Sequence, residues 1–292
     1  MAIMNHIIEE TENGWPVKAV VLNTLQVSNT AYSRMKFNGG VHLDGEICYA
    51  NDIVHTGQEL VLTEMAEPGY QVQPFKWDIP VLYEDEYLYV VNKPAPMASQ
   101  TGTRKFSDTL ENAMYYQLGA PADFIFRPVN RLDKGTSGLM TVAKSGHVHA
   151  LLQKQLHTEM FIRTYLAITE GVPEPGEGIV DLSIGRMEGS TIKRMVRQDG
   201  KQAVTRYRVE ERRGSRALVW LKLETGRTHQ IRVHMQALGC PVAGDYIYGT
   251  ELEAMIGRFA LHSAYLSFLH PITGETISVQ ADLPQELRAL LC

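Results

Sequence analysis

One carboxylate lies in a setting that suggests chemistry. In the segment RPVNRLDKGTSGLM, Asp133 follows Arg131 by two residues and precedes a turn, Thr136-Ser137-Gly138, and then apolar residues. Two interpretations fit this pattern. The acid forms a salt bridge that fixes a loop, or it is a nucleophile kept in its ionised form. An isolated Arg-x-Asp is more often structural, because ion pairs outnumber catalytic acids.

Two further segments carry polar groups inside apolar runs. FIRTYLAI holds Arg163 and Tyr165, and ETGRTHQIRVH places Arg227 at the tip of a strand-to-helix turn. If the three segments meet in one cleft, Asp133 faces Arg227, and a nearby opposite charge favours the ionised carboxylate. Such a carboxylate can attack an electrophilic carbon. The Tyr165 ring can stack on a base, and its phenol can move a proton.

The same residues argue against several other site classes. Ile231, one helical turn after Arg227, can form an apolar wall of the site. No second acid accompanies these segments, whereas glycosidases use a pair of carboxylates, so a glycosidase is not indicated. His229 and His234 are five residues apart, which does not fit a metal pair on a helix, so no metal site is predicted. Neither a P-loop nor Gly-x-Gly-x-x-Gly occurs, so no nucleotide cofactor is expected.

Composition places the chain among ordinary globular proteins. It has 292 residues, 44% hydrophobic and 21% charged, without an apolar run that spans a bilayer. The start, MAIMNHIIEETENG, lacks the features of a secretory signal. Cys48, Cys240 and Cys292 are scattered, so a reducing cytoplasm is expected. The net charge of −5 argues against a surface basic all over, but it is compatible with a local basic groove.

The pattern of elements predicts two units and an α+β fold. Residues 1–63 predict a small domain in the order helix, helix, hairpin, strand, with Asp44-Gly45 as the hairpin turn. Residues 64–78 contain prolines and glycine and are typical of a linker. Residues 79–292 contain strand-like runs not in strict alternation with helices, and Ser145 is a candidate helix cap.

Several motifs, in a fixed order, resemble the pseudouridine synthases of the RluA type. They are EDEYLYVVNKPAPMASQTG, RLDKGTSGLM, RTYLAI, ETGRTHQIRVHMQALGCPVAGDYIYG and ALHSAYLSFLHPITGE. The resemblance covers roughly residues 78 to 288. It implies a mixed, mostly antiparallel sheet with a central catalytic cleft. It also implies isomerisation of specific uridines in ribosomal or transfer RNA to pseudouridine, by base flipping and without a cofactor.

The resemblance assigns roles to named residues. Asp133 matches the catalytic aspartate, Tyr165 the tyrosine that stacks on the flipped uracil, and Arg227 the basic residue paired with the aspartate. The candidates for substrate binding share these motifs; they are Arg131, Ile231, Asn130, Arg163 and Thr136. The segment departs from the commonest family form at three positions: Asn130 replaces a histidine, Gly135 a frequent acid, and Arg163 a frequent lysine.

The small N-terminal domain resembles, less strongly, a helix-helix-hairpin RNA-binding module first known from a ribosomal protein. Such modules carry a basic second helix, whereas only Arg34 and Lys36 are basic here, so a role in packing is the alternative. In the larger unit, GSTIKRMVRQDGKQA predicts a basic hairpin over the cleft or a solvated loop. The residues expected along an RNA path are Lys93, Arg104, Lys105, Arg163, Lys193, Arg194, Arg197, Arg206 and Arg208.

The sequence therefore predicts an RNA pseudouridine synthase with RNA as its partner, active as a monomer in the cytoplasm. Two alternatives remain open at this point. One is a non-catalytic RNA-binding or ribosome-assembly protein on the same scaffold. The other is a hydrolase that releases free uracil, which needs a second acid or base to activate water.

Overall fold

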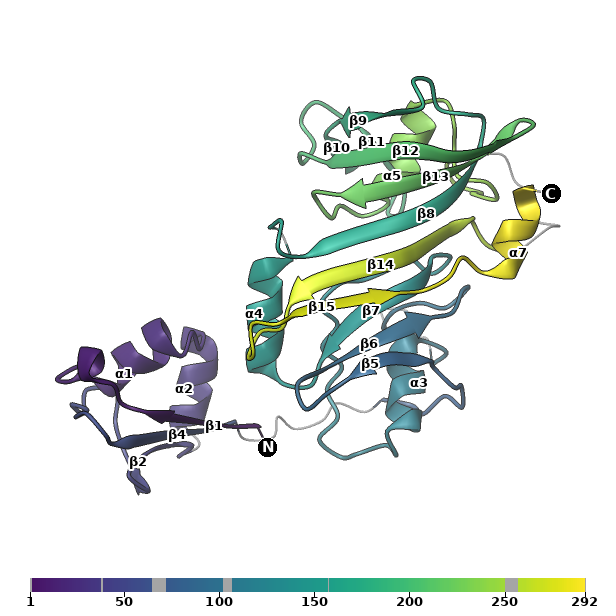
Figure 1. The fold of residues 1–292 in the computed structure, drawn as a ribbon. Helices are drawn as coiled ribbons and strands as arrows, with labels where there is room; N and C mark the ends of the chain where they lie inside the picture. The colour runs from purple at the N-terminus through teal and green to yellow at the C-terminus, as the bar shows by residue number, and fades with distance from the viewer. Residues whose placement is uncertain are drawn as a thin grey trace.

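The computed structural model of the chain describes residues 2–37, 39–64, 72–101, 107–156, 158–249 and 257–291. It shows an α+β protein whose described strands form a four-stranded sheet, a nine-stranded sheet and a two-stranded hairpin (Figure 1). Among the described residues, no helix combines the length and apolar character needed to cross a bilayer.

The N-terminal residues form a four-stranded antiparallel sheet in the order β1-β4-β2-β3. Its elements are β1 (Ala2–Ile7), η1 (Glu10–Glu12), α1 (Val17–Ala19), η2 (Val20–Thr24), α2 (Asn29–Phe37), β2 (Val41–Leu43), β3 (Glu46–Ile47) and β4 (Glu59–Glu64). The predicted order is confirmed from the helices onward, but strand β1 was not predicted. Asp44 and Gly45 have φ values of 51° and 84°, as the turn of a two-residue hairpin requires.

Nine of the later strands build the large sheet, in the order β5-β6-β7-β14-β8-β13-β12-β9, with β15 paired to β14. These strands are β5 (Val81–Glu84), β6 (Leu88–Lys93), β7 (Ser137–Ala143), β8 (Ile162–Glu170), β9 (Glu177–Asp181), β12 (Val204–Arg213), β13 (Arg216–Leu223), β14 (Leu261–Leu269) and β15 (Thr276–Gln280). The β7–β14 pair is parallel and the other pairs are antiparallel. This confirms the mixed, mostly antiparallel sheet expected from the sequence.

Among the described residues, few helices accompany this sheet. They are α3 (Leu110–Gln117), α4 (Gly146–Gln155), α5 (Gln230–Ala237), α7 (Gln285–Arg288) and the 3₁₀ turn η3 (Ala289–Leu291). Ser145 caps α4 as predicted, because its hydroxyl accepts a hydrogen bond from the Val148 N–H at 3.2 Å. Helix α3 was not predicted from the sequence; Thr109 and Asn112 form a capping box at its start.

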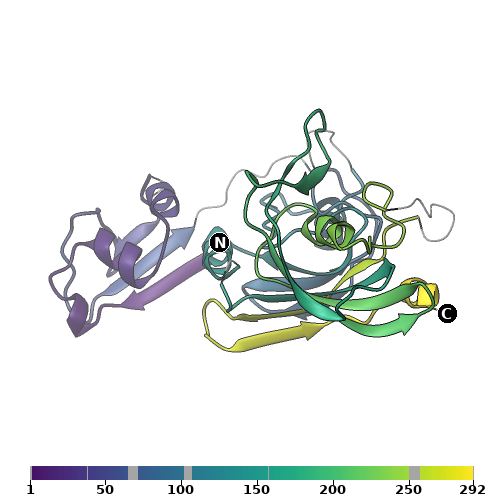
Figure 2. The same ribbon diagram turned by 90° about the horizontal axis from the view of Figure 1, so that it is seen from above.

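Helix α5 and a short hairpin lie on one face of the large sheet (Figure 2). The hairpin consists of β10 (Ile184–Arg186) and β11 (Arg194–Val196), paired antiparallel. The basic segment at residues 189–203 supplies strand β11 and part of the connection before it, so the hairpin interpretation is correct for that part, but none of its residues lines the pocket described below. Strand β13 leads through residues 224–229 into α5, which confirms the predicted strand-to-helix turn.

Candidate active site

A pocket of about 840 Å³ collects the segments singled out in the sequence. It is lined by the loop before β7, by strand β8 and by the turn into α5. All eight candidate residues line it: Asp133, Tyr165, Arg227, Arg131, Ile231, Asn130, Arg163 and Thr136. The prediction that these distant segments meet in one cleft is therefore confirmed, while the role of each residue remains a prediction.

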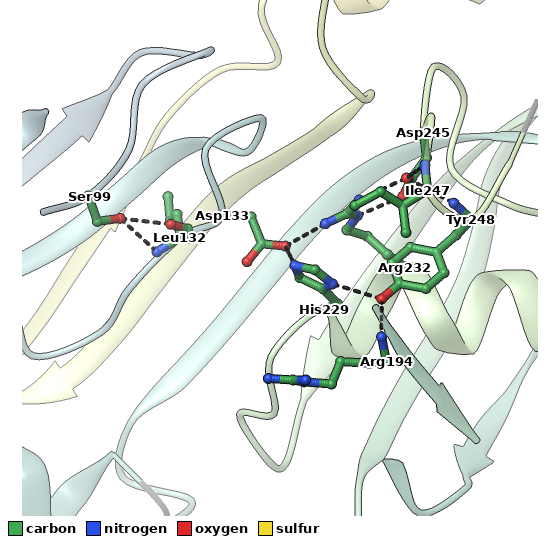
Figure 3. A network of polar contacts seen from close by, with 9 residues as sticks. All are labelled: Ser99, Leu132, Asp133, Arg194, His229, Arg232, Asp245, Ile247 and Tyr248. Atoms are coloured by element: carbon green, nitrogen blue, oxygen red, sulfur yellow. Dashed lines mark hydrogen bonds and ion pairs between the residues drawn. The ribbon is translucent and has the colours of Figure 1, made fainter. Parts of the chain in front are cut away.

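The loop that carries Asp133 is fastened on both sides of the carboxylate. The Ser99 hydroxyl donates to the Leu132 carbonyl at 2.7 Å and accepts from the Leu132 N–H at 3.2 Å (Figure 3). The Thr136 N–H donates to the Asp133 carbonyl at 3.0 Å and closes the turn. Because the backbone is held before and after Asp133, few conformations remain open to it, and its side chain is 27% exposed.

Asp133 is paired with Arg232, not with Arg227 as predicted. Arg232 Nη1 lies 3.1 Å from Asp133 Oδ2, and His229 Nε2 lies 3.8 Å from the same oxygen (Figure 3). Among the contacts between described residues, none is made to Oδ1. Oδ2 is therefore held by the Arg232 guanidinium, and Oδ1 is left for a reaction partner.

Arg232 can act as this partner because it is fixed from several sides. Its guanidinium donates to Asp245 through Nε at 2.6 Å and through Nη2 at 2.8 Å. It also lies over the rings of Phe259, 4.1 Å away, and Tyr248, 4.9 Å away. The Arg232 side chain is 2% exposed, so this cation needs a carboxylate partner in the protein.

Arg227 occupies a different place in the turn. Its Nε donates to the Gln202 carbonyl at 2.9 Å, and its backbone N–H donates to Gln230 Oε1 at 2.9 Å. Gln230 in turn donates to the Val204 carbonyl at 3.0 Å and ties the turn to β12. Arg227 lines the pocket, but its guanidinium is bonded to the segment before β12, and its predicted partnership with the aspartate passes to Arg232.

Tyr165 and Arg163 lie two residues apart on β8 and therefore point to the same face of the sheet. Burial raises the pKa of the Tyr165 phenol, while Arg163 acts in the opposite direction, so the phenol keeps its proton at neutral pH. Arg163 is 5% exposed and donates to the Leu156 carbonyl at 3.2 Å. Its Nε has no partner among the described residues, and the residue lines the pocket.

The other residues predicted to bind substrate differ in how far their side chains are open to the pocket. Ile231 is buried in the first turn of α5 and forms an apolar wall. Arg131 is exposed beside the pocket. The Asn130 amide is engaged with β7: its Oδ1 accepts from the Thr141 N–H at 2.8 Å, and its Nδ2 donates to the Leu139 carbonyl at 3.4 Å. In this structure Asn130 supports the loop rather than offering free polar atoms.

Two glycines of the Asp133 loop have steric explanations. A Cβ on Gly138, whose φ is +107°, would lie 2.2 Å from the Ser263 carbonyl oxygen. A Cβ on Gly135 would lie 2.6 Å from the Phe259 ring, so a larger residue at this position would require the ring to move. The Phe259 ring also lies over Arg232, so the glycine at position 135 is part of the packing around the site.

Two expectations about the RNA path need revision. Lys93 is fully buried and donates to the carbonyls of Met97 at 2.6 Å and Pro94 at 3.0 Å, so it cannot line an RNA surface. Burial, with Arg258 adding to it, lowers the pKa of Lys93 to about 7. Arg104 and Lys105 lie outside the described residues.

The arrangement combines an oriented carboxylate, an aromatic ring, an apolar wall and several cations. No group of His, Cys, Asp and Glu side chains among the described residues is arranged to hold a metal ion. The groups that are present suit nucleophilic catalysis on a polyanionic substrate that inserts a flat ring into the pocket.

Comparison with known proteins points to one family. A family model described as RNA pseudouridylate synthase matches residues 87–237. A ribosomal large subunit pseudouridine synthase D of Xanthomonas campestris pv. campestris is 35% identical over 283 residues, which cover 91% of this chain and 84% of that protein. An uncharacterized RNA pseudouridine synthase of Bacillus subtilis is 38% identical over 274 residues, which cover 91% of this chain and 95% of that protein.

Solved structures show the same likeness. The human RNA pseudouridylate synthase domain containing 1 superposes with a TM-score of 0.59 at 28% identity. The match covers 70% of this chain and 83% of the human chain.

Proposed function

The chain belongs to the RNA pseudouridylate synthase family and is an isomerase that acts on RNA, and on this premise we propose that it modifies uridine in large-subunit ribosomal RNA with Asp133 as the nucleophile. The observation that carries the proposal is the state of the Asp133 carboxylate. Its Oδ2 is held by Arg232 at 3.1 Å, while its Oδ1 is free of contacts with the other described residues and borders the pocket.

The reaction needs a nucleophile that adds and later leaves. The uridine first swings out of its stack, because its glycosidic carbon cannot be reached inside a helix. In the proposed route, Asp133 Oδ1 bonds to the ribose C1′ as the bond from C1′ to uracil N1 breaks. The uracil turns, its C5 bonds to C1′, and the carboxylate leaves. The C5 proton is then lost and N1 gains one, so the product is an isomer of the substrate.

The pocket supplies the other requirements of this route. The buried Tyr165 ring offers a stacking surface to the detached uracil, and Ile231 faces it with an apolar side chain. Arg163 provides a cation without a carboxylate partner among the described residues. We propose that it contacts a phosphate beside the flipped nucleotide, because a buried guanidinium is stabilised by a bound anion.

Charge is distributed along the chain in a way that suits RNA binding by the large sheet. Residues 79–292 contain 24 Lys and Arg against 23 Asp and Glu, a net charge of +1, whereas residues 1–78 contain 4 against 10, a net charge of −6. An acidic N-terminal part is a poor electrostatic match for a polyanion. We therefore assign RNA binding mainly to residues 79–292.

The domain division remains part of the proposal. We propose a small domain at residues 1–63, a linker at 64–78 and a catalytic domain at 79–292. One apolar core has all its described members between Ile8 and Leu62, which supports a separate small domain. The choice of ribosomal RNA over transfer RNA rests on the name of the Xanthomonas relative. We propose that the protein works as a monomer in the cytoplasm.

Pseudouridine mapping tests this proposal directly. Total RNA from a strain lacking the gene is incubated with the wild-type protein, with Asp133→Asn, or with Asp123→Asn. Asp123 is an exposed aspartate and serves as the matched control. We expect new pseudouridine in large-subunit ribosomal RNA with the wild type and Asp123→Asn, and none with Asp133→Asn, which should still bind RNA.

Other outcomes lead to different conclusions. Turnover by Asp133→Asn would remove Asp133 as the nucleophile. New pseudouridine only in transfer RNA would overturn the proposed target but not the activity. Release of free uracil would support a hydrolase, and salt-dependent RNA binding without any product would support a non-catalytic RNA-binding protein.

A further inference from the structure

A second residue contacts the same carboxylate oxygen as Arg232. His229 Nε2 lies 3.8 Å from Asp133 Oδ2, and its Nδ1 lies 2.7 Å from the Tyr248 hydroxyl (Figure 3). The imidazole therefore stands between the aspartate and a buried phenol. Building on the proposed role of Asp133, we propose that His229 is a positioning residue that holds the aspartate by Oδ2, with its own orientation set by Tyr248.

The hydrogen bonds around Tyr248 fix which nitrogen of His229 carries the proton. The Tyr248 hydroxyl oxygen accepts the backbone N–H of Arg194, in β11, at 2.8 Å. Among the described residues, its own proton has one acceptor within reach, His229 Nδ1. A neutral imidazole that accepts at Nδ1 carries its proton on Nε2. That Nε2–H faces Asp133, so the ring is a donor toward the carboxylate.

The backbone also constrains His229. Its φ is 60°, in the left-handed region, where few residues other than glycine are found and histidine is among the exceptions. The conformation places the residue directly before α5, with Gln230 bonded to β12 on its other side. Strained backbone of this kind is concentrated at functional sites, because the surrounding structure must hold it in place.

The electrostatic surroundings keep the ring neutral near pH 7. Burial lowers the pKa of His229; Asp133 opposes this effect, and Arg232 adds to it. The groups that face the ring from the neighbouring elements are Asp133, Arg232, Asp245, Arg194 and Tyr248. A neutral donor holds the carboxylate without taking its negative charge, which a nucleophile must keep.

The distance of 3.8 Å is too long for a hydrogen bond in the free protein. Catalytic hydrogen bonds are often long without substrate and tighten in the complex. Arg194 belongs to the β10–β11 hairpin, so these hydrogen bonds connect the hairpin through Tyr248 to His229, beside the aspartate.

Three substitutions test separately the contact of His229 with Asp133 and its hydrogen bond with Tyr248. Asparagine tolerates a positive φ and can still accept from Tyr248, but it does not reach Asp133. Glutamine extends to the position of Nε2 and keeps a donor there. Tyr248→Phe removes the hydroxyl. The controls are His55→Asn, at an exposed histidine, and Tyr246→Phe, at a tyrosine that is 62% exposed.

The experiment measures the single-turnover rate at saturating enzyme and, separately, the dissociation constant for RNA. We expect His229→Asn to slow the chemical step about 100-fold, as a small misplacement of a reacting group does, with RNA affinity unchanged. His229→Gln should recover most of this rate, Tyr248→Phe should be slower than Tyr246→Phe, and His55→Asn should match the wild type.

The ¹⁵N NMR spectrum of the wild-type histidine rings provides a readout that needs no activity. The His229 signal, assigned by its loss in His229→Gln, should show the neutral form protonated at Nε2. A proton on Nδ1 would overturn the proposal even if His229→Asn or Tyr248→Phe fails to fold. Wild-type rate in His229→Asn, or equal losses of rate and affinity, would also overturn it. Turnover by Asp133→Asn would instead refute the proposed nucleophile.

Discussion

Replacing Arg232 by methionine should destabilise the catalytic domain strongly, because it leaves a buried charge without a partner. Asp245 is 0% exposed and accepts two hydrogen bonds from Arg232, at 2.6 and 2.8 Å. Methionine keeps part of the side-chain volume but offers no donor. The effect therefore reports the loss of the ion pair rather than a large cavity.

The size of the effect follows from burial. Removing one partner of a buried ion pair costs about 3–5 kcal/mol. Loss of the cation–π contact with Phe259 adds up to about 1 kcal/mol. The contact with Asp133 adds less, since that carboxylate is 27% exposed and water can replace the arginine. A loss of about 4 kcal/mol lowers the melting temperature by about 8–16 °C for a domain of this size.

Thermal unfolding, followed by circular dichroism, measures this in a double-mutant cycle with Asp245→Asn. Because the two side chains stabilise each other, the double variant should lose less than the sum of the single losses, by about 2 kcal/mol. Arg212→Met is the control, since the Arg212–Glu174 pair is 53% and 68% exposed and should contribute under about 1 kcal/mol. A small shift for Arg232→Met, or strict additivity, would refute the reasoning.

Three further predictions concern catalysis, RNA binding and pH. Tyr165→Phe should keep the stacking ring but lose the phenol, so the rate should fall more than RNA affinity; equal losses would make Tyr165 a contact residue only. The logarithm of RNA affinity should fall with the logarithm of salt concentration, and Arg163→Gln should reduce this slope by about 0.7, the value for one phosphate on a single strand. An unchanged slope would refute the phosphate contact. Burial lowers the pKa of His262 from its ordinary value of 6.5 to about 4. Between these two pH values the unfolded chain therefore binds a proton that the folded chain does not. The free energy of unfolding should therefore fall by on the order of 3 kcal/mol between about pH 6.5 and 4. His262→Gln should remove that part of the pH dependence in denaturant titrations, and an unchanged dependence would contradict the assignment.

Local signals in the sequence predicted the local structure well. Asp44-Gly45 predicted a two-residue hairpin because both positions need positive φ, which these residues tolerate. Ser145 predicted a helix start because its hydroxyl can accept a backbone N–H. Strand β1 was missed because its place depends on pairing with β4, more than fifty residues away. A pairing partner at that distance leaves no local mark.

The sequence indicated the wrong arginine as the ionic partner of Asp133. Arg227 stands at the tip of a turn, where an exposed cation is expected to face the cleft, but its Nε donates to the Gln202 carbonyl before β12. Arg232 stands between Ile231 and Val233 on a buried helix face. An arginine between two apolar helix residues indicates a buried guanidinium, and a buried guanidinium requires a carboxylate partner. Asp245, further along the chain, was available as that partner.

The sequence by itself determined the family, the α+β class and the segments that form the pocket, because motif residues and strand or helix periods are properties of neighbours along the chain. Only the tertiary structure decided that Arg232 rather than Arg227 holds Asp133, that Lys93 is buried, and that His229 connects the aspartate to Tyr248. Such contacts join residues from separate elements. Their directions depend on how the sheet and α5 pack, and sequence spacing does not encode that packing.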